Sequence, residues 1–133
     1  MPKFLLMVNA DNGVVDTNTD DWEPDEVRAH MNYYEVLGKE LVENGEQVQF
    51  MALAHPRLAR IVRSDGVSAP VVTDGPYPES KEVLAGFQVI DVESEERAIE
   101  IAALVSAVPG PGGVPIQQPI EVRQVMTESG SDV

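Results

Sequence analysis

The residues best suited to chemistry lie in one short stretch, TDGPYPESKEVLAGF, at positions 73–87. Asp74 closes an apolar run and is followed by Gly75 and Pro76. Glycine lets a ligand approach the backbone closely, and proline keeps the residue before it out of the helical region, so we expect a stiff turn beside the acid. Three further side chains able to contact a ligand follow this turn: Tyr77, Glu79 and Lys81.

A pocket rim is one interpretation of this corner. In that case Asp74 accepts a proton, Lys81 holds an anionic group and Tyr77 packs on the ligand, while residues 79–82 form one helical turn. A purely structural corner is the other interpretation, because Asp-Gly-Pro is a common turn and exposed Glu/Lys pairs contribute only about 0–1 kcal/mol. Spacing alone leaves both interpretations open.

His30 is a second candidate proton acceptor. A neutral imidazole near a carboxylate acts as a general base at neutral pH, although a lone helical histidine is also often a packed or solvated residue. The other histidine, His55, is a weaker candidate. Because the chain has two histidines, no cysteine, no calcium-loop motif and no phosphate loop, the sequence predicts no metal and no cofactor.

The first half of the chain predicts a strand, a helix, a strand and a hairpin. An apolar run predicts a strand over 3–10, and Pro24 begins a helix that Asn44-Gly45 ends. Alternation over 46–54, with Val48, Phe50 and Ala52 on one face, predicts the next strand. The hairpin consists of ARIVRS and APVVTD around Asp65-Gly66, where glycine supplies a positive φ.

The second half predicts a strand, a helix and a final strand. Strands are expected over 85–92 and 119–126, and Ser94 caps the helix between them. The run Pro109–Gly113 ends this helix and predicts a flexible connection. Among the apolar residues that this helix carries are Ala98, Ile99, Ala102, Leu104 and Val105.

Without the hairpin, this order is βαββαβ, a ferredoxin-like α+β fold with an inserted β-hairpin. Two helices then cover one face of an antiparallel sheet. The opposite face carries Phe, Val and Ile and remains open, so we expect a homodimer whose sheets pack face to face. Residues 1–126 are expected to form one domain, and 127–133 a flexible C-terminal tail.

The charge of the chain excludes some partners. With 23 acidic and 9 basic residues, its net charge of -14 opposes direct binding to nucleic acid or to an anionic membrane surface. No apolar run approaches the length of a membrane span or of a signal-peptide core, so a cytoplasmic location is expected.

The corner also resembles the signature of the DGPF-domain family, within the YCII-related superfamily. Matching segments, in chain order, are Asp74-Gly75-Pro76-Tyr77, Glu79-Ser80-Lys81-Glu82, Leu84-Ala85-Gly86-Phe87, Ile90-Asp91-Val92 and Glu121-Val122-Arg123-Gln124-Val125. Arg28-Ala29-His30, followed by Tyr34, resembles a helix motif of related YCII-like proteins. The resemblance implies a dimeric α+β barrel and, by likeness to those relatives, a small enzyme that uses a His/Asp pair, here His30 and Asp74.

Two functions are consistent with these observations. The first is a small-molecule-binding protein or small enzyme whose acid/base residue, His30 or Asp74, lies in the barrel cleft. The alternative is an acidic accessory protein that acts by contact with a protein partner, since the resembled family is associated with transcription initiation and sigma factors. The sequence predicts neither a substrate nor a reaction.

Overall fold

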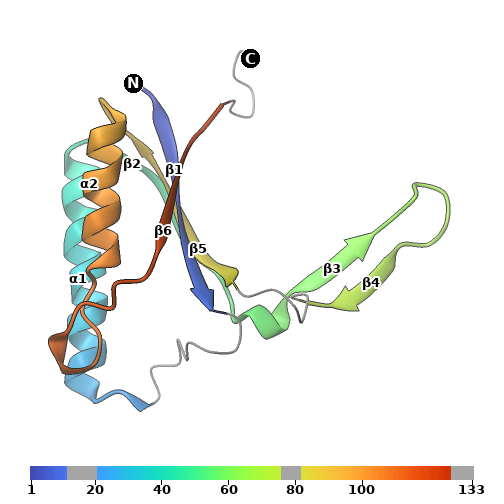
Figure 1. The fold of residues 1–133 in the computed structure, drawn as a ribbon, viewed down its shortest axis with the longest axis horizontal. Helices are drawn as coiled ribbons and strands as arrows, with labels where there is room; N and C mark the ends of the chain where they lie inside the picture. Colours follow the sequence, from blue (N-terminus) through green and yellow to red (C-terminus); the bar gives the residue numbers. More distant parts are fainter. Residues whose placement is uncertain (12–20, 76–81, 127–133) are drawn as a thin grey trace.

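The computed structural model describes residues 1–11, 21–75 and 82–126 (Figure 1). In this part of the chain, two helices pack on one face of a four-stranded sheet, and a two-stranded hairpin stands apart. The helices are α1 (Pro24–Glu43) and α2 (Glu95–Ser106), with short 3-10 turns η2 (Pro56–Leu58) and η3 (Pro111–Gly113). The strands are β1 (Lys3–Asp11), β2 (Gln47–Ala52), β3 (Arg60–Arg63), β4 (Val71–Asp74), β5 (Glu82–Asp91) and β6 (Ile120–Gln124).

The sheet confirms the predicted ferredoxin-like topology. Its strand order is β2-β5-β1-β6, and every neighbouring pair is antiparallel. Removing the hairpin leaves the order strand, helix, strand, strand, helix, strand, with both helices on the same face (Figure 1). The sheet of this single chain does not close into a barrel within the described residues.

The boundaries of α1 follow from local signals. Glu23 and Glu26 form a reciprocal capping box, and Pro24 occupies the first turn, where its missing N–H costs nothing. Asn44 caps the other end, and Gly45 adopts a φ of 73°. The helix therefore ends where the sequence predicted, because glycine takes the left-handed conformation without strain.

The second helix begins as predicted, and one of its faces is buried. Ser94 accepts a hydrogen bond from the Arg97 N–H, which caps the helix. Ile99 is 54% exposed and Leu104 42% exposed, so these two apolar residues lie outside the buried face of the helix. The buried face at the i, i+3, i+4, i+7 spacing of one helical stripe consists of Ala98, Ile101, Ala102 and Val105.

The core lies between these helices and the sheet. From the sheet it receives Phe4, Leu6 and Ile90, and from α1 Leu37 and Leu41. Because side chains alternate along a strand, the neighbours of these residues point to the other face of the sheet. That face consists in part of Leu5, Met7, Phe87, Val89 and Met51.

Two strands differ locally from their predicted form. The register of β2 against β5 shifts between Gln47 and Gln49, so Val48 does not follow the simple alternation expected of it. Glu82 begins β5 rather than ending a helical turn, and the rest of that predicted turn, residues 79–81, lies outside the described residues. The predicted tail, 127–133, also lies outside them.

The hairpin β3–β4 is confirmed and forms an arm, residues 56–74, that projects from the sheet (Figure 1). Its register runs from Arg60↔Asp74 to Arg63↔Val71, so the connecting loop is longer than the Asp65-Gly66 turn. Asp65 accepts hydrogen bonds from Val67 N and Ser68 N, which lower its pKa. Gly66 has the predicted positive φ, 81°.

Candidate ligand pocket

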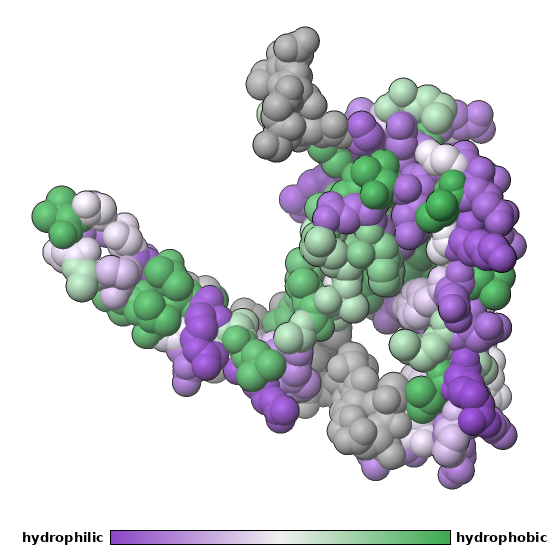
Figure 2. Space-filling view, turned by 180° about the vertical axis from the view of Figure 1, so that it is seen from behind, coloured by the Kyte–Doolittle hydropathy of each residue, from purple (hydrophilic) through white to green (hydrophobic). Residues whose placement is uncertain are grey.

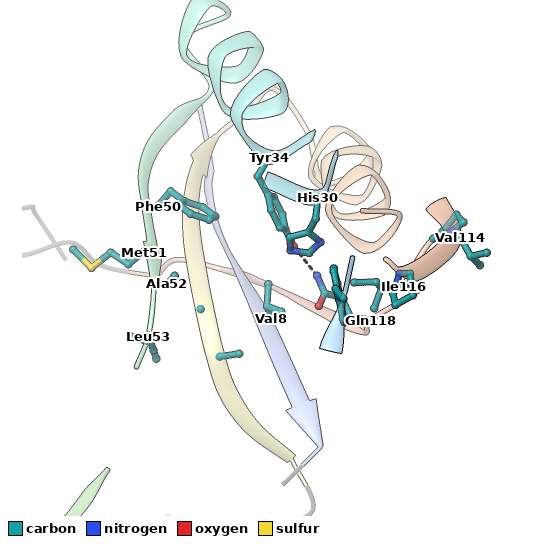
Figure 3. A pocket seen from close by; sticks show the side chains of 15 residues that line it. Val8, His30, Tyr34, Phe50, Met51, Ala52, Leu53, Val114, Ile116 and Gln118 are labelled. Atoms are coloured by element: carbon teal, nitrogen blue, oxygen red, sulfur yellow. Dashed lines mark hydrogen bonds between the residues drawn. The ribbon is translucent and has the colours of Figure 1, made fainter. Parts of the chain in front are cut away.

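A cavity of about 690 Å³ lies on the helix-covered side of the sheet, between the first half of α1 and the chain that follows α2. Val8 from β1, Phe50 from β2 and Gly86 from β5 form its sheet wall, and His30 and Tyr34 come from α1 (Figure 3). Val8 and Tyr34 also pack against the core, so the cavity continues the same layer. The residues of one chain therefore suffice to form this cavity.

Hydrogen bonds join the chain after α2 to α1. The His30 Nδ1 atom lies 2.9 Å from the Pro109 carbonyl oxygen, and the Gly112 N–H donates to the Glu26 carboxylate. That hydrogen bond, followed by one from the Glu23 N–H, lowers the pKa of Glu26. Gly110 N donates to Val114 O over 2.8 Å, closing a loop. The connection that the sequence predicts to be flexible is thus a hydrogen-bonded loop. The side chains of Glu26 and His30, which are distant in the sequence, bind it to α1.

His30 has a defined hydrogen-bonding role in the cavity. A carbonyl oxygen only accepts, so the contact with Pro109 places the proton of the neutral imidazole on Nδ1 and leaves Nε2 as an acceptor. The ring stands edge-to-face between Trp22 and Tyr34, with centroid distances of 5.2 and 5.1 Å. Such contacts hold the imidazole in one orientation.

Tyr34 supplies a complementary donor. Its hydroxyl oxygen accepts a hydrogen bond from Gln118 Nε2 over 2.8 Å, drawn as the dashed line in Figure 3. Burial raises the pKa of Tyr34, and the Gln118 contact only partly opposes this, so the phenol stays protonated. Gln117, directly before Gln118, has a φ of 59°, a conformation uncommon outside glycine.

The sheet wall depends on a close approach between two strands. A Cβ added to Gly86 would lie 2.9 Å from the Met51 carbonyl oxygen, so only glycine fits between β5 and β2 here. The opposite side of the cavity is formed by Pro111, Val114, Pro115 and Ile116 of the loop after α2. No aspartate, glutamate, lysine or arginine occurs among the described residues that line the cavity.

Asp74 lies elsewhere. It is the last residue of β4 at the base of the arm, is 89% exposed through its side chain, and faces Arg60 at 3.5 Å. It does not line the cavity, so the described residues of one chain do not bring Asp74 and His30 into one site. The other predicted ligand contacts, Tyr77, Glu79 and Lys81, lie outside the described residues.

Gly75 packs closely against the arm. Its φ is not positive, and a Cβ there would lie 3.0 Å from two side-chain carbons of Ile61. The missing side chain accommodates the neighbouring strand of the arm, which is a packing reason for this glycine.

Sequence reasoning did not single out three pocket residues. Trp22 is the only tryptophan in the chain and lies just before α1, which was an available signal. Phe50 was assigned to a strand face without a ligand role. Gln118 carried no signal because it lies in an irregular segment between η3 and β6. Their convergence depends on the path of the loop after α2.

The fold and the cavity define a small α+β protein with a neutral, aromatic-rich pocket between its sheet and its longer helix. A model of the YCII-related domain matches residues 3–114. The chain therefore belongs to the YCII-related family. A comparison with curated proteins found no match.

Two further features concern residues 1–11, 21–75 and 82–126. No helix among them is long and apolar enough to cross a membrane. In the same ranges, no three His, Cys, Asp or Glu side chains gather in a way that suits a metal ion.

Proposed function

We propose that this YCII-related protein binds a small organic molecule in the pocket beside α1, with His30 Nε2 as the proton or hydrogen-bond acceptor. The observation that carries the proposal is the combination of an apolar cavity of about 690 Å³ with an acceptor and a donor, His30 and Tyr34, on one wall. Pockets of this size with a few convergent polar groups are typical ligand sites. The same acceptor suits a general base.

A thermal-shift screen against a broad metabolite set tests the proposal on three proteins: the wild type and two variants. Ala52→Phe places a ring at an exposed position that lines the cavity, and Asp74→Ala removes the acid on the arm. A ligand at about 100 times its Kd adds about 2.7 kcal/mol of stability. We expect the stabilisation to be lost in Ala52→Phe and retained in Asp74→Ala.

The outcomes separate the candidate sites. Stabilisation that survives Ala52→Phe would overturn the pocket proposal. Stabilisation lost in both variants would mean that Asp74 reaches the pocket, as the predicted His/Asp pair requires. If no compound stabilises the wild type, the alternative, an acidic accessory protein acting by protein contact in transcription initiation, is favoured.

We further propose that the protein is a homodimer and that it belongs to the DGPF-domain branch of its family. The open sheet face carries Leu5, Met7, Phe87 and Val89, which a second copy would cover. The arm adds apolar surface at Val62, Val71 and Val72 (Figure 2). It also holds three of the nine basic residues and only two of the 23 acids, so it complements the acidic remainder of another copy.

Light scattering after size-exclusion chromatography tests the dimer. Val62→Glu combined with Val72→Glu puts two acids on the arm and should convert a dimer into a monomer, whereas Ser68→Glu at the tip of the arm should leave the dimer intact. A wild type that runs as a monomer at micromolar concentration would contradict the proposal. High salt should weaken the dimer, because the complementary charges are screened.

A further inference from the structure

The polar groups of the pocket indicate which hydrogen-bonding group the ligand carries. The Nδ1–H of His30 donates to the Pro109 carbonyl oxygen. The ring atom left for a bound ligand is therefore Nε2, which accepts a hydrogen bond. Tyr34 uses an oxygen lone pair on Gln118, and no acceptor for its O–H is present among the described residues. A group that both donates and accepts at one atom satisfies the two together, and a hydroxyl is the simplest such group.

The aromatic walls of the cavity indicate the shape of the ligand. Trp22, His30, Tyr34 and Phe50 form a continuous series of rings, the last pair having centroids 6.2 Å apart. Aromatic side chains at such distances offer edges and faces to a planar ring. Figure 3 shows Phe50 and Val8 on the sheet side, and Tyr34 and His30 across from them. A slab-shaped apolar ligand therefore has contacts on both of its faces.

The described lining also disfavours a charged occupant. Neither lysine, arginine, aspartate nor glutamate occurs among the described residues that line the cavity. An ionised carboxylate or ammonium would lose its hydration there without gaining an ion pair, which is costly. A neutral hydroxyl keeps its hydrogen bonds through His30 and Tyr34.

We propose, building on the ligand-binding function above, that the occupant is an uncharged planar aromatic molecule with a hydroxyl group, whose O–H donates to His30 Nε2 and whose oxygen accepts from the Tyr34 hydroxyl. The ligand class is thus phenol-like, and its hydroxyl hydrogen points to the Nε2 lone pair of His30. This assignment distinguishes His30, which recognises the donor, from Tyr34, which recognises the oxygen.

Isothermal titration with three matched probes tests the assignment. 2-Naphthol has the full hydroxyl, 2-methoxynaphthalene keeps the oxygen but has no donor, and 2-naphthoate is charged. We expect 2-naphthol to bind at least tenfold more tightly than the ether, because a site that hydrogen-bonds a hydroxyl rejects analogues without it. Binding of 2-naphthoate should be the weakest.

Two variants assign the two hydrogen bonds. His30→Phe keeps a ring but removes the acceptor, so the preference for 2-naphthol over the ether should fall to about onefold. Tyr34→Phe removes the donor that serves both oxygens, so both affinities should fall by a similar factor and the preference should persist. Circular dichroism checks that each variant is folded, and the wild-type comparison stands without them.

The results separate this inference from the pocket proposal. Equal binding of naphthol and ether by the wild type, tighter binding of 2-naphthoate, or no binding of any probe would overturn the phenol-like class. The pocket proposal would survive these outcomes if another compound from the screen is lost in Ala52→Phe. Tight binding of 2-naphthoate is the result that the predicted anion-holding role of Lys81 requires.

Discussion

The two ends of the helix–sheet layer differ in what covers the sheet. At one end α2 covers it, and Leu6, Ile90 and Ile101 are buried completely or nearly so. Beyond the end of α2, a loop rich in proline and glycine takes its place, and a cavity of about 690 Å³ lies beneath it. The 20 residues of α1 span about 30 Å and the 12 of α2 about 18 Å, so α1 extends past its partner.

This difference shows how a fold reserves room for a ligand without losing its core. A helix covers the sheet with a dense stripe of side chains. A loop rich in proline and glycine covers the same part of the sheet but fills less of the space above it. The side chains of Glu26 and His30 then hold that loop in place from α1. The fully packed end stabilises the fold, and the loop-covered end remains open to a ligand.

The largest expected contrast comes from two Leu→Ala substitutions. Leu6 is 1% exposed in the packed end, whereas Leu53 is 44% exposed and lines the cavity. Leu6→Ala should lower the free energy of unfolding by about 2–5 kcal/mol through lost burial and a new void. Leu53→Ala should cost less than about 1 kcal/mol. Urea denaturation measures both, and equal losses would mean that the two ends do not differ in packing.

The next contrast uses two Glu→Gln substitutions. Glu46 accepts from Arg97 Nε and Nη2, both at 2.9 Å, and its side chain is largely buried. This pairing lowers the pKa of Glu46 below its ordinary value of 4.5. Glu46→Gln should cost about 1.5–3 kcal/mol, as for hydrogen bonds to charged groups. Glu121 forms an exposed pair with Arg123, so Glu121→Gln should cost at most about 1 kcal/mol.

The pH dependence of Glu46→Gln has a defined sign. Because the folded pKa of Glu46 is depressed, its contribution is present above the ordinary value and is lost as pH falls through the folded pKa. The difference in Tm between wild type and Glu46→Gln should therefore be largest near neutral pH and shrink below about pH 4.5. A difference that grows on acidification would contradict the role of this carboxylate.

A further contrast uses two Gly→Ala substitutions with opposite signs. Gly86→Ala puts a Cβ 2.9 Å from Met51 O and should cost about 1–3 kcal/mol as β2 and β5 are forced apart. Gly38 lies within α1, where an added Cβ meets nothing nearer than Gln47 Nε2 at 3.8 Å. Gly38→Ala should therefore stabilise by up to about 1 kcal/mol. Thermal unfolding of both variants checks the signs.

Much of the fold was predictable because its signals are local. The capping residues and Asn44-Gly45 end α1 within a few positions of the prediction, and alternation located the strands. The buried face of α2 was not predictable in the same way. Ile99, Ile101 and Leu104 are all apolar, and only the position of the sheet decides which of them is buried.

The candidate site was predictable only in part. His30 was selected for its chemistry and does line the cavity, while its proposed role as proton acceptor is untested. Gln118 and Phe50 come from distant parts of the chain, and their meeting depends on how the loop after α2 returns to α1. Asp74 attracted attention through its turn, yet the turn places it on the arm beside Arg60.

A crystal structure with 6-bromo-2-naphthol tests the central claim, that the loop-covered end of the layer is a ligand site, most directly. Anomalous scattering locates the bromine independently of how the ligand is built. The account predicts one bromine peak within the cavity, with the hydroxyl next to His30 Nε2 and Tyr34 Oη. A peak on the open sheet face or on the arm, with the cavity empty, would contradict it.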